Sequence, residues 1–322
     1  MRCPAKTWRW FRRTFTTLIF CLTFHLKRLS MAKSESTILV VGAAGKFAGL
    51  VVPELVGRGA TVRALVRDEA KASLARSMGA SEIAIGDLGD ADSLVDACRG
   101  VGGVFHIGPA FVANEAAMGV SLVEAAERSG VTKFVFSSVI QPTNIALENH
   151  ASKIPVEDAL YSSRLVYTVL HSANLMQNIG LAWPAIVRDG RFGEPFPSES
   201  RVARVDYRDV AELAAVALTG ERLDYATLEL AAGMYSRHDI VAAIADVLGR
   251  PIEAFAPAFD DWVRAARPPY DERQLRMLER VFHHYASCGL GGNSLTLTAA
   301  LGREPRSLRD YVRDLAGTGR AA

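Results

Sequence analysis

TILVVGAAGKFAGLVVPELVGRGATVRALVRD, residues 37–68, is the stretch that decides the fold. Residues 38–41 form a short apolar run rich in β-branched side chains, which is typical of a strand buried on both faces. A glycine turn then leads into a helix expected at residues 46–56, and a second buried strand is expected at residues 61–66. Strand, turn, helix and strand within about thirty residues indicate a βαβ unit.

The turn after the first strand carries small residues at three-residue spacing, Gly42, Gly45 and Ala48. Gly42 can adopt a backbone conformation closed to other residues, Gly45 lets a phosphate approach the backbone, and Ala48 lets the helix pack closely on the strand. The helix start offers free N–H groups and a positive dipole end to an anion. We expect dinucleotide binding here, against the alternative of a tight turn without a ligand. The expected contacts are Gly42, Ala44, Gly45, Lys46 and Phe47.

The second strand ends at Arg67, where an NAD site usually places a carboxylate for the ribose hydroxyls. A guanidinium at this position would instead pair with the 2′-phosphate of NADP, and Lys71 lies one helical turn further on. Asp68 is adjacent and offers the alternative of ribose binding. The sequence therefore favours NADP(H) as the cofactor, with NAD(H) as the alternative.

Composition and charge exclude several classes of protein. The 322 residues are 49% hydrophobic, which is ordinary for a globular chain with a large core. The four cysteines have no paired spacing, so we expect neither a disulfide framework nor a zinc site. This cysteine usage fits a reducing compartment, and we expect a cytoplasmic location. Residues 1–30 hold seven basic residues and no acid, so removing them from the net charge of +2 leaves −5. Such a body has no basic stripe for nucleic acid.

Residues 1–35 stand apart from the expected fold. An apolar run at residues 15–26 is too short for an ordinary transmembrane helix, so no stable membrane insertion is expected. The segment reads as an Arg-rich leader, as an interfacial basic anchor, or as an untranslated extension before Met31. We favour the last reading and expect the segment to be disordered, because a dinucleotide-binding domain needs nothing upstream of it.

Strands and helices continue to alternate after residue 68, which predicts a doubly wound, mostly parallel α/β sheet. Further strands are expected at residues 82–85, 103–107, 133–138 and 166–170, with helices at residues 69–78, 114–129 and 151–163. Beyond residue 172 the rhythm loosens. Short strands at residues 203–205 and 227–230 and helices at residues 210–218, 238–248, 271–284, 294–301 and 308–315 suggest a smaller C-terminal lobe that closes over the cofactor.

Several polar residues follow the predicted strands directly, at the carboxyl edge where open parallel sheets bind ligands. Asp87, followed by Leu88, would face the adenine, although an Asx turn or a helix cap explains an aspartate here equally well. His106 ends the fourth strand, and Ser138 ends the fifth. The pair His283 and His284 has no third ligand in the sequence, so no metal site is expected.

Together these features carry a family resemblance. The matching segments are residues 42–45, 86–88, 104–109, 133–138, 149–153, 167–170, 176–178, 205–210, 285–293 and 301–305. Over roughly residues 37–316 the chain resembles the NmrA-like branch of the atypical short-chain dehydrogenase/reductases. The resemblance implies a Rossmann-type domain that binds NAD(P), usually NADP(H). It implies either a reductase of quinones, azo dyes or aromatic ethers, or a regulator that binds the cofactor without turnover.

One position departs from the short-chain reductase pattern. The usual tyrosine four residues before the lysine is replaced by Asn149, so the ordinary phenol acid is absent. Lys153 is expected to bind the nicotinamide ribose and, with its pKa lowered by burial, to move a proton. His150 and Ser138 are expected to assist as proton donor and hydrogen-bonding group. His171 and Ser172 replace an Arg-Pro pair that the family often shows after the sixth strand.

These observations lead to one functional prediction and one alternative. We expect residues 36–318 to form the NAD(P)-binding domain, with residues 36–172 as its Rossmann core and residues 173–318 mainly as a substrate lobe. The predicted activity is transfer of a hydride from NAD(P)H to a quinone-like or conjugated small molecule, a reaction in which the cofactor supplies the difficult step. The alternative is a non-catalytic NADP(H) sensor that acts through protein partners.

Overall fold

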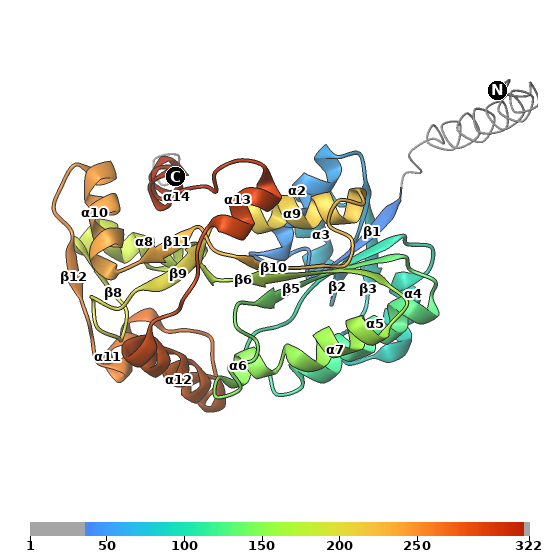
Figure 1. Ribbon diagram of the computed structural model, residues 1–322, viewed down its shortest axis with the longest axis horizontal. Helices are drawn as coiled ribbons and strands as arrows, with labels where there is room; N and C mark the ends of the chain where they lie inside the picture. The colour runs from blue at the N-terminus through green and yellow to red at the C-terminus, as the bar shows by residue number, and fades with distance from the viewer. Residues whose placement is uncertain (1–35, 319–322) are drawn as a thin grey trace, which may run out of the picture. The chain divides into compact units, whose positions relative to one another are not determined.

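The computed structural model describes residues 36–318, so the expectations for residues 1–35 lie outside the described part of the chain. Within that part a seven-stranded parallel sheet forms the centre of the fold (Figure 1). Its strands are, in spatial order, β10 (Ala226–Leu230), β6 (Val166–Ser172), β5 (Lys133–Val139), β4 (Gly103–Ile107), β1 (Thr37–Val41), β2 (Thr61–Val66) and β3 (Glu82–Ile85). This is the doubly wound α/β fold that the strand–helix alternation predicts.

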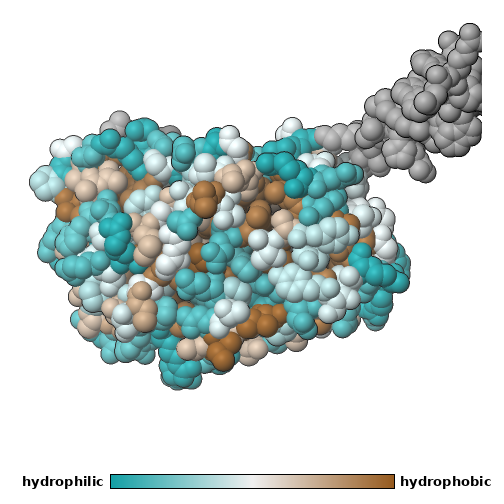
Figure 2. All heavy atoms as spheres, in the orientation of Figure 1, coloured by the Kyte–Doolittle hydropathy of each residue, from teal (hydrophilic) through white to brown (hydrophobic). Residues whose placement is uncertain are grey.

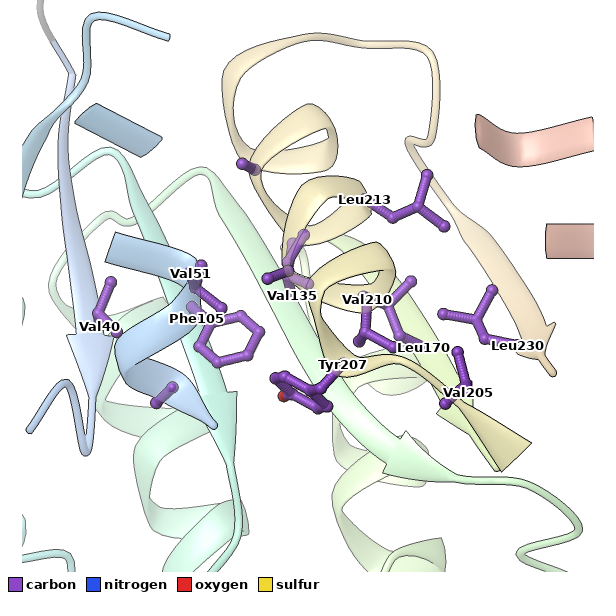
Figure 3. Close-up of a cluster of buried hydrophobic side chains, with 14 of the residues drawn as sticks. Val40, Val51, Phe105, Val135, Leu170, Val205, Tyr207, Val210, Leu213 and Leu230 are labelled. Atoms are coloured by element: carbon purple, nitrogen blue, oxygen red, sulfur yellow. The ribbon is translucent and has the colours of Figure 1, made fainter. Parts of the chain in front are cut away.

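Helices cover both faces of the sheet, as the apolar character of its strands requires. One face carries α2 (Ala48–Gly57), α3 (Glu69–Ser77), α9 (Tyr207–Thr219) and α13 (Leu295–Leu301). The other carries α4 (Ala91–Cys98), α5 (Glu115–Arg128) and α7 (Ile154–Ser162). Figure 3 shows α9 beside α2 over the sheet, with the fully buried Tyr207 near Phe105 and Val135.

A smaller lobe follows the sixth strand. It contains a sheet of β11 (Gly233–Tyr235), β9 (Val202–Val205) and β7 (Asn174–Leu175), and a second sheet of β12 (Glu253–Phe255) and β8 (Arg191–Gly193). Its helices are α8 (Gln177–Asp189), α10 (Arg237–Leu248), α11 (Phe259–Ala266), α12 (Glu272–Cys288) and α14 (Leu308–Thr318). A separate buried cluster that includes Met176, Trp183 and Ile240 holds α8, α10 and α14 together.

The structure differs from the sequence expectations at two places. The segment expected as one helix at residues 151–163 is two, α6 (Glu148–Ala151) and α7, because Pro155 sits in the first turn of α7 and favours a helix start there. The strand at residues 226–230 pairs in parallel with β6, and α13 packs against it, so part of the chain after residue 172 belongs to the central sheet. The division of the domain at residue 172 stays a prediction.

Candidate functional site

The turn between β1 and α2 has the properties of a phosphate site. Gly42 has φ +69°, in the left-handed region, and an added Cβ there would find no heavy atom within 4 Å. Its N–H donates to the Leu65 carbonyl at 3.2 Å, and the Gly45 N–H donates to the Gly42 carbonyl at 2.7 Å. The N-cap of α2, Phe47, provides no side-chain cap. An open, uncapped helix start next to a left-handed glycine fits an anionic group.

Close contacts around the turn require small residues at Gly45, as expected, and at Gly49 rather than Ala48. A Cβ on Gly45 would lie 2.9 Å from the Gly42 carbonyl oxygen, so Gly45 keeps the turn tight. Ala48 is buried at the start of α2, but the closest approach is at Gly49, where a Cβ would lie 2.6 Å from the Met78 sulfur and 3.0 Å from the Ala43 carbonyl oxygen. Close packing of α2 therefore depends on Gly49.

The other predicted contacts of the turn also have protein partners. Lys46 donates from Nζ to the Gln177 carbonyl of α8 at 2.6 Å, and partial burial of its ammonium lowers its pKa. Phe47 is half-buried, with its ring centroid 5.2 Å from that of Tyr207, and Ala44 is half-buried beside it in the same cluster. Lys46 thus ties the turn to the first residue of α8.

The end of β2 carries the residues predicted to contact the adenosine ribose. Asp68 caps α3, because its Oδ1 accepts from the Lys71 N–H at 2.9 Å, so this carboxylate already has a structural role. Arg67 and the Lys71 side chain are exposed at the same end of the strand. Two exposed cations here are the arrangement expected for a 2′-phosphate.

Asp87 follows β3 and forms an Asx turn. Its Oδ1 accepts from the Gly89 N–H at 2.8 Å, as in the Asx turn that is the alternative to adenine binding at this position. Its exposed side chain lies at the carboxyl edge of the sheet, whereas Leu88 is half-buried against the cluster under α4 and α5. A role of Asp87 in adenine binding stays a prediction.

Lys153 lies at the junction of α6 and α7, where it is the N-cap of α7. Its ammonium forms an ion pair with Glu115, the first residue of α5, and both side chains are buried. The second carboxylate oxygen of Glu115 accepts from Ser152 Oγ at 3.1 Å. Sequence reasoning missed Glu115, because an acidic residue in a first helical turn is ordinary and its partner is 38 positions away.

Two histidines lie near Lys153, and burial lowers the pKa of both. His106 stacks on Phe136 with ring centroids 5.5 Å apart, and burial, assisted by the Lys153 charge, lowers its pKa to about 3. His150 is 1% exposed, and its Nδ1 lies 3.1 Å from the Gln141 carbonyl oxygen, so we assign the proton to Nδ1. Both rings are therefore neutral at pH 7, which disfavours the expected role of His150 as a proton donor.

Ser138 is bonded into a buried cluster rather than left free. Its Oγ donates to Glu157 Oε1 at 2.6 Å, and His171 Nε2 lies 3.0 Å from the same oxygen. Tyr161 donates to Glu157 Oε2 at 3.2 Å. Burial opposes ionisation of Glu157, but the bonds from His171 and Ser138 outweigh it and lower the pKa of the carboxyl. Sequence reasoning missed Glu157, which stands one helical turn after Lys153.

Two buried polar atoms at this edge have no hydrogen-bond partner among residues 36–318, His106 Nδ1 and Asn149 Oδ1. Asn149 occupies the position of the family tyrosine, and buried polar atoms normally have partners, which a bound ligand can supply. Together with the open turn at Gly42, these atoms show that the residues present fit a dinucleotide. Residues 36–318 contain no group of three or more His, Cys, Asp or Glu placed to hold a metal ion. They also contain no helix that is long and apolar enough to cross a bilayer.

Comparisons with known proteins agree with this geometry. The profile of the NmrA-like family matches residues 34–312. The chain is 31% identical over 225 residues to an NAD(P)H azoreductase of Xenophilus azovorans, which covers 68% of this chain and 76% of that protein. It is 27% identical over 157 residues to quinone oxidoreductase 2 of Escherichia coli (strain K12). That alignment covers 48% of this chain and 54% of that protein.

Solved structures show the same fold. The NADPH-dependent quinone oxidoreductase QOR2 of Escherichia coli, complexed with NADPH, superposes with a TM-score of 0.75 at 23% identity over 87% of this chain and 99% of that one. NmrA, a negative transcriptional regulator in complex with NADP, superposes with a TM-score of 0.68 at 17% identity. The superposition covers 89% of this chain and 97% of that one. At these identities the likeness concerns the fold alone.

Proposed function

The chain belongs to the NmrA-like family, and from that premise we propose that it is an NADP(H)-dependent reductase of a quinone-like or otherwise conjugated small molecule. The observation that carries the proposal is the open, uncapped helix start at the left-handed Gly42, combined with the buried cation Lys153 at the same carboxyl edge of the sheet. The likeness to an azoreductase over two thirds of the chain supports a reductase.

Different parts of the edge would hold different parts of the cofactor. The uncapped start of α2, in front of the turn that Gly42 and Gly45 keep open and tight, would hold the two linked phosphates, and Arg67 would pair with a 2′-phosphate. Lys153 would hold the nicotinamide ribose. The bound cofactor supplies a hydride, so the chain itself has to bind, orient and exclude water from the acceptor.

The preference for NADP(H) rests on Arg67, because Asp68 already caps α3. Titration calorimetry with NADPH and NADH tests it directly. We expect NADPH to bind at least about tenfold more tightly, since one charge-assisted pair contributes roughly 1.4 kcal/mol or more. Equal dissociation constants would remove the preference.

The reductase itself is tested by mixing the purified protein with NADPH and a panel of quinones and azo compounds and following the loss of NADPH absorbance. We expect turnover with some members of the panel and its loss in Lys153→Met. Turnover of that variant at the wild-type rate would remove Lys153 from the mechanism.

A non-catalytic NADP(H) sensor is the second candidate, and two observations favour it. Asn149 stands in place of the tyrosine acid, and Ser138 is bonded to Glu157. A sensor needs a surface for a protein partner. Figure 2 shows hydrophobic residues at the surface around α6 and α7, and Ile145, just before α6, is 73% exposed. Tight NADPH binding without turnover on any acceptor would favour this candidate. A cytoplasmic location and the absence of direct nucleic-acid binding stay predictions.

A further inference from the structure

Glu115 is a buried carboxylate that the proposed function does not yet use. Its side chain is 3% exposed, and both of its oxygens contact the junction between α6 and α7. One forms the ion pair with Lys153, and the other accepts a hydrogen bond from Ser152. Lys153 needs such a partner, because an ammonium at the N-cap of α7 faces the positive end of that helix dipole. A carboxylate at the first residue of α5 is favoured by its own helix dipole.

Packing of α5 against α7 does not depend on this ion pair. Gly119 of α5 lies so close to Val156 of α7 that an added Cβ would be 2.5 Å from a Val156 methyl, and Leu122 and Leu160 are fully buried in the same cluster. The apolar contact thus fixes the two helices. What the ion pair adds is the location of the Lys153 ammonium, whose charge reaches both His106 and His150.

Gly108 leaves the space that the carboxylate occupies. It follows β4 directly, and a Cβ there would lie 2.5 Å from Glu115 Oε1 and 3.1 Å from Glu115 Cγ. The three nearest atoms all belong to the Glu115 side chain, so a methyl group at residue 108 would displace the carboxylate and leave the backbone in place. Position 108 is therefore a probe of Glu115 that removes no charge.

We propose that Glu115 is a positioning residue, which holds the Lys153 ammonium beside His106 and His150 at the carboxyl edge of the sheet so that it can bind the cofactor. The inference rests on the proposed function, because it assigns Lys153 to the cofactor. It adds that Lys153 acts as one half of an ion pair and that Gly108 is small because of that pair.

The first test needs no cofactor. Acylation of Lys153 in the free protein is followed by mass spectrometry in wild type and in Glu115→Gln. We expect Lys153 to react at least about tenfold faster in the variant, because an ammonium without its carboxylate loses its proton more readily in a buried site. Equal rates of acylation would overturn the proposal.

The second test measures the NADPH dissociation constant and kcat/KM against pH. Glu115→Gln and Gly108→Ala should each weaken NADPH binding about tenfold or more. A loss of this size is what the removal of roughly one charged hydrogen bond to the cofactor would cause. The pH profile of kcat/KM for Glu115→Gln should also differ from that of wild type, because the carboxylate that faces the Lys153 ammonium is gone. Glu127→Gln is the matched control, since Glu127 lies on the same helix and pairs with the exposed Arg164. It should leave affinity and pH profile unchanged.

A charge swap separates positioning from folding. The double variant Glu115→Lys with Lys153→Glu restores an ion pair between the same helices, so its melting temperature should recover relative to Glu115→Gln while NADPH binding should not. Recovery of binding together with stability would show that the pair is only structural. Loss of binding in Lys153→Met with normal binding in Glu115→Gln would overturn this inference alone, whereas normal binding in Lys153→Met would remove the proposed role of Lys153.

Discussion

Replacing Gly42 by alanine tests the phosphate turn, and Gly59 supplies a matched control. Both glycines have left-handed backbones, with φ +69° and +79°, and an added Cβ meets no heavy atom within 4 Å at either. Neither substitution creates a clash, so each should lose only about 1–2 kcal/mol of stability through backbone strain. For a domain of this size that loss lowers the melting temperature by a few degrees.

The two variants should differ in cofactor binding. Gly42 directly follows β1, in front of the uncapped start of α2, so a methyl group there enters the space through which a phosphate would approach. Gly59 lies just beyond the other end of α2 and borders no predicted contact. A charged hydrogen bond contributes about 1.5–3 kcal/mol, so losing one at the turn should weaken NADPH binding roughly 10- to 150-fold.

The assay is a pair of measurements on three proteins, a thermal melt and a calorimetric titration with NADPH. We expect both variants to melt slightly earlier than wild type and only Gly42→Ala to bind NADPH weakly. If Gly42→Ala binds NADPH with the wild-type dissociation constant, the phosphates are not held at this turn, and the placement of the whole cofactor is refuted.

Substitutions at three further positions probe other parts of the edge. Arg67→Glu should weaken NADPH binding about tenfold or more and leave NADH binding unchanged in calorimetry; an equal loss for both would exclude contact with the 2′-phosphate. His106 has a pKa of about 3 in the folded protein, against 6.5 for an ordinary solvated histidine. Between pH 6.5 and pH 3 only the unfolded chain therefore protonates this imidazole. The free energy of unfolding consequently falls as the pH drops below about 6.5. His106→Phe should flatten that fall in urea titrations by up to about 1.4 kcal/mol per pH unit, and an unchanged slope would contradict the neutral ring. Glu157→Ala should lose about 1–3 kcal/mol for each buried donor left without an acceptor, and Glu157→Gln, which keeps an acceptor oxygen, should lose less; equal losses would show that the hydrogen bonds contribute little.

Local patterns predicted the central sheet well. Residues 61–66, 82–85 and 103–107 are strands with the expected bounds, because parallel strands buried on both faces read as apolar runs between turn residues. The glycine turn also folds as expected. Its meaning depends on residues only a few positions apart, so it is visible in one short stretch.

Contacts between distant residues were not visible in the same way. Nothing in the local pattern around Glu115 or Lys153 indicates that they pair, since each is an ordinary residue at a helix start. Ser138 likewise reads as a free hydroxyl until α7 places Glu157 against it. The strand expected at residues 227–230 of the small lobe is β10 of the central sheet, since strand order in a sheet is decided by packing across the fold rather than by sequence period.

The supply of protons limits the acceptors that this site can reduce. A ketone that becomes an alcohol needs a proton on its oxygen as the hydride arrives, since an alkoxide is a strong base at neutral pH. The Lys153 ammonium is held in its ion pair with Glu115, and the neighbouring residues within 36–318 do not offer an acid of that kind. Asn149 replaces the tyrosine, and burial keeps His106 and His150 neutral.

A quinone-like acceptor is not subject to this limit, because hydride transfer leaves a phenolate, which is a far weaker base than an alkoxide and can take its proton from solvent afterwards. We therefore expect turnover of quinones at a rate that changes little between about pH 6 and pH 8, below the ordinary phenol pKa of about 10. We expect no measurable turnover of aliphatic ketones of similar size. The measurement is NADPH oxidation with matched pairs of quinone and saturated diketone, with Asn149→Tyr as the second protein. Ketone reduction by wild type would show that some group at this edge does donate a proton, and ketone reduction gained only in Asn149→Tyr would locate the missing acid at residue 149.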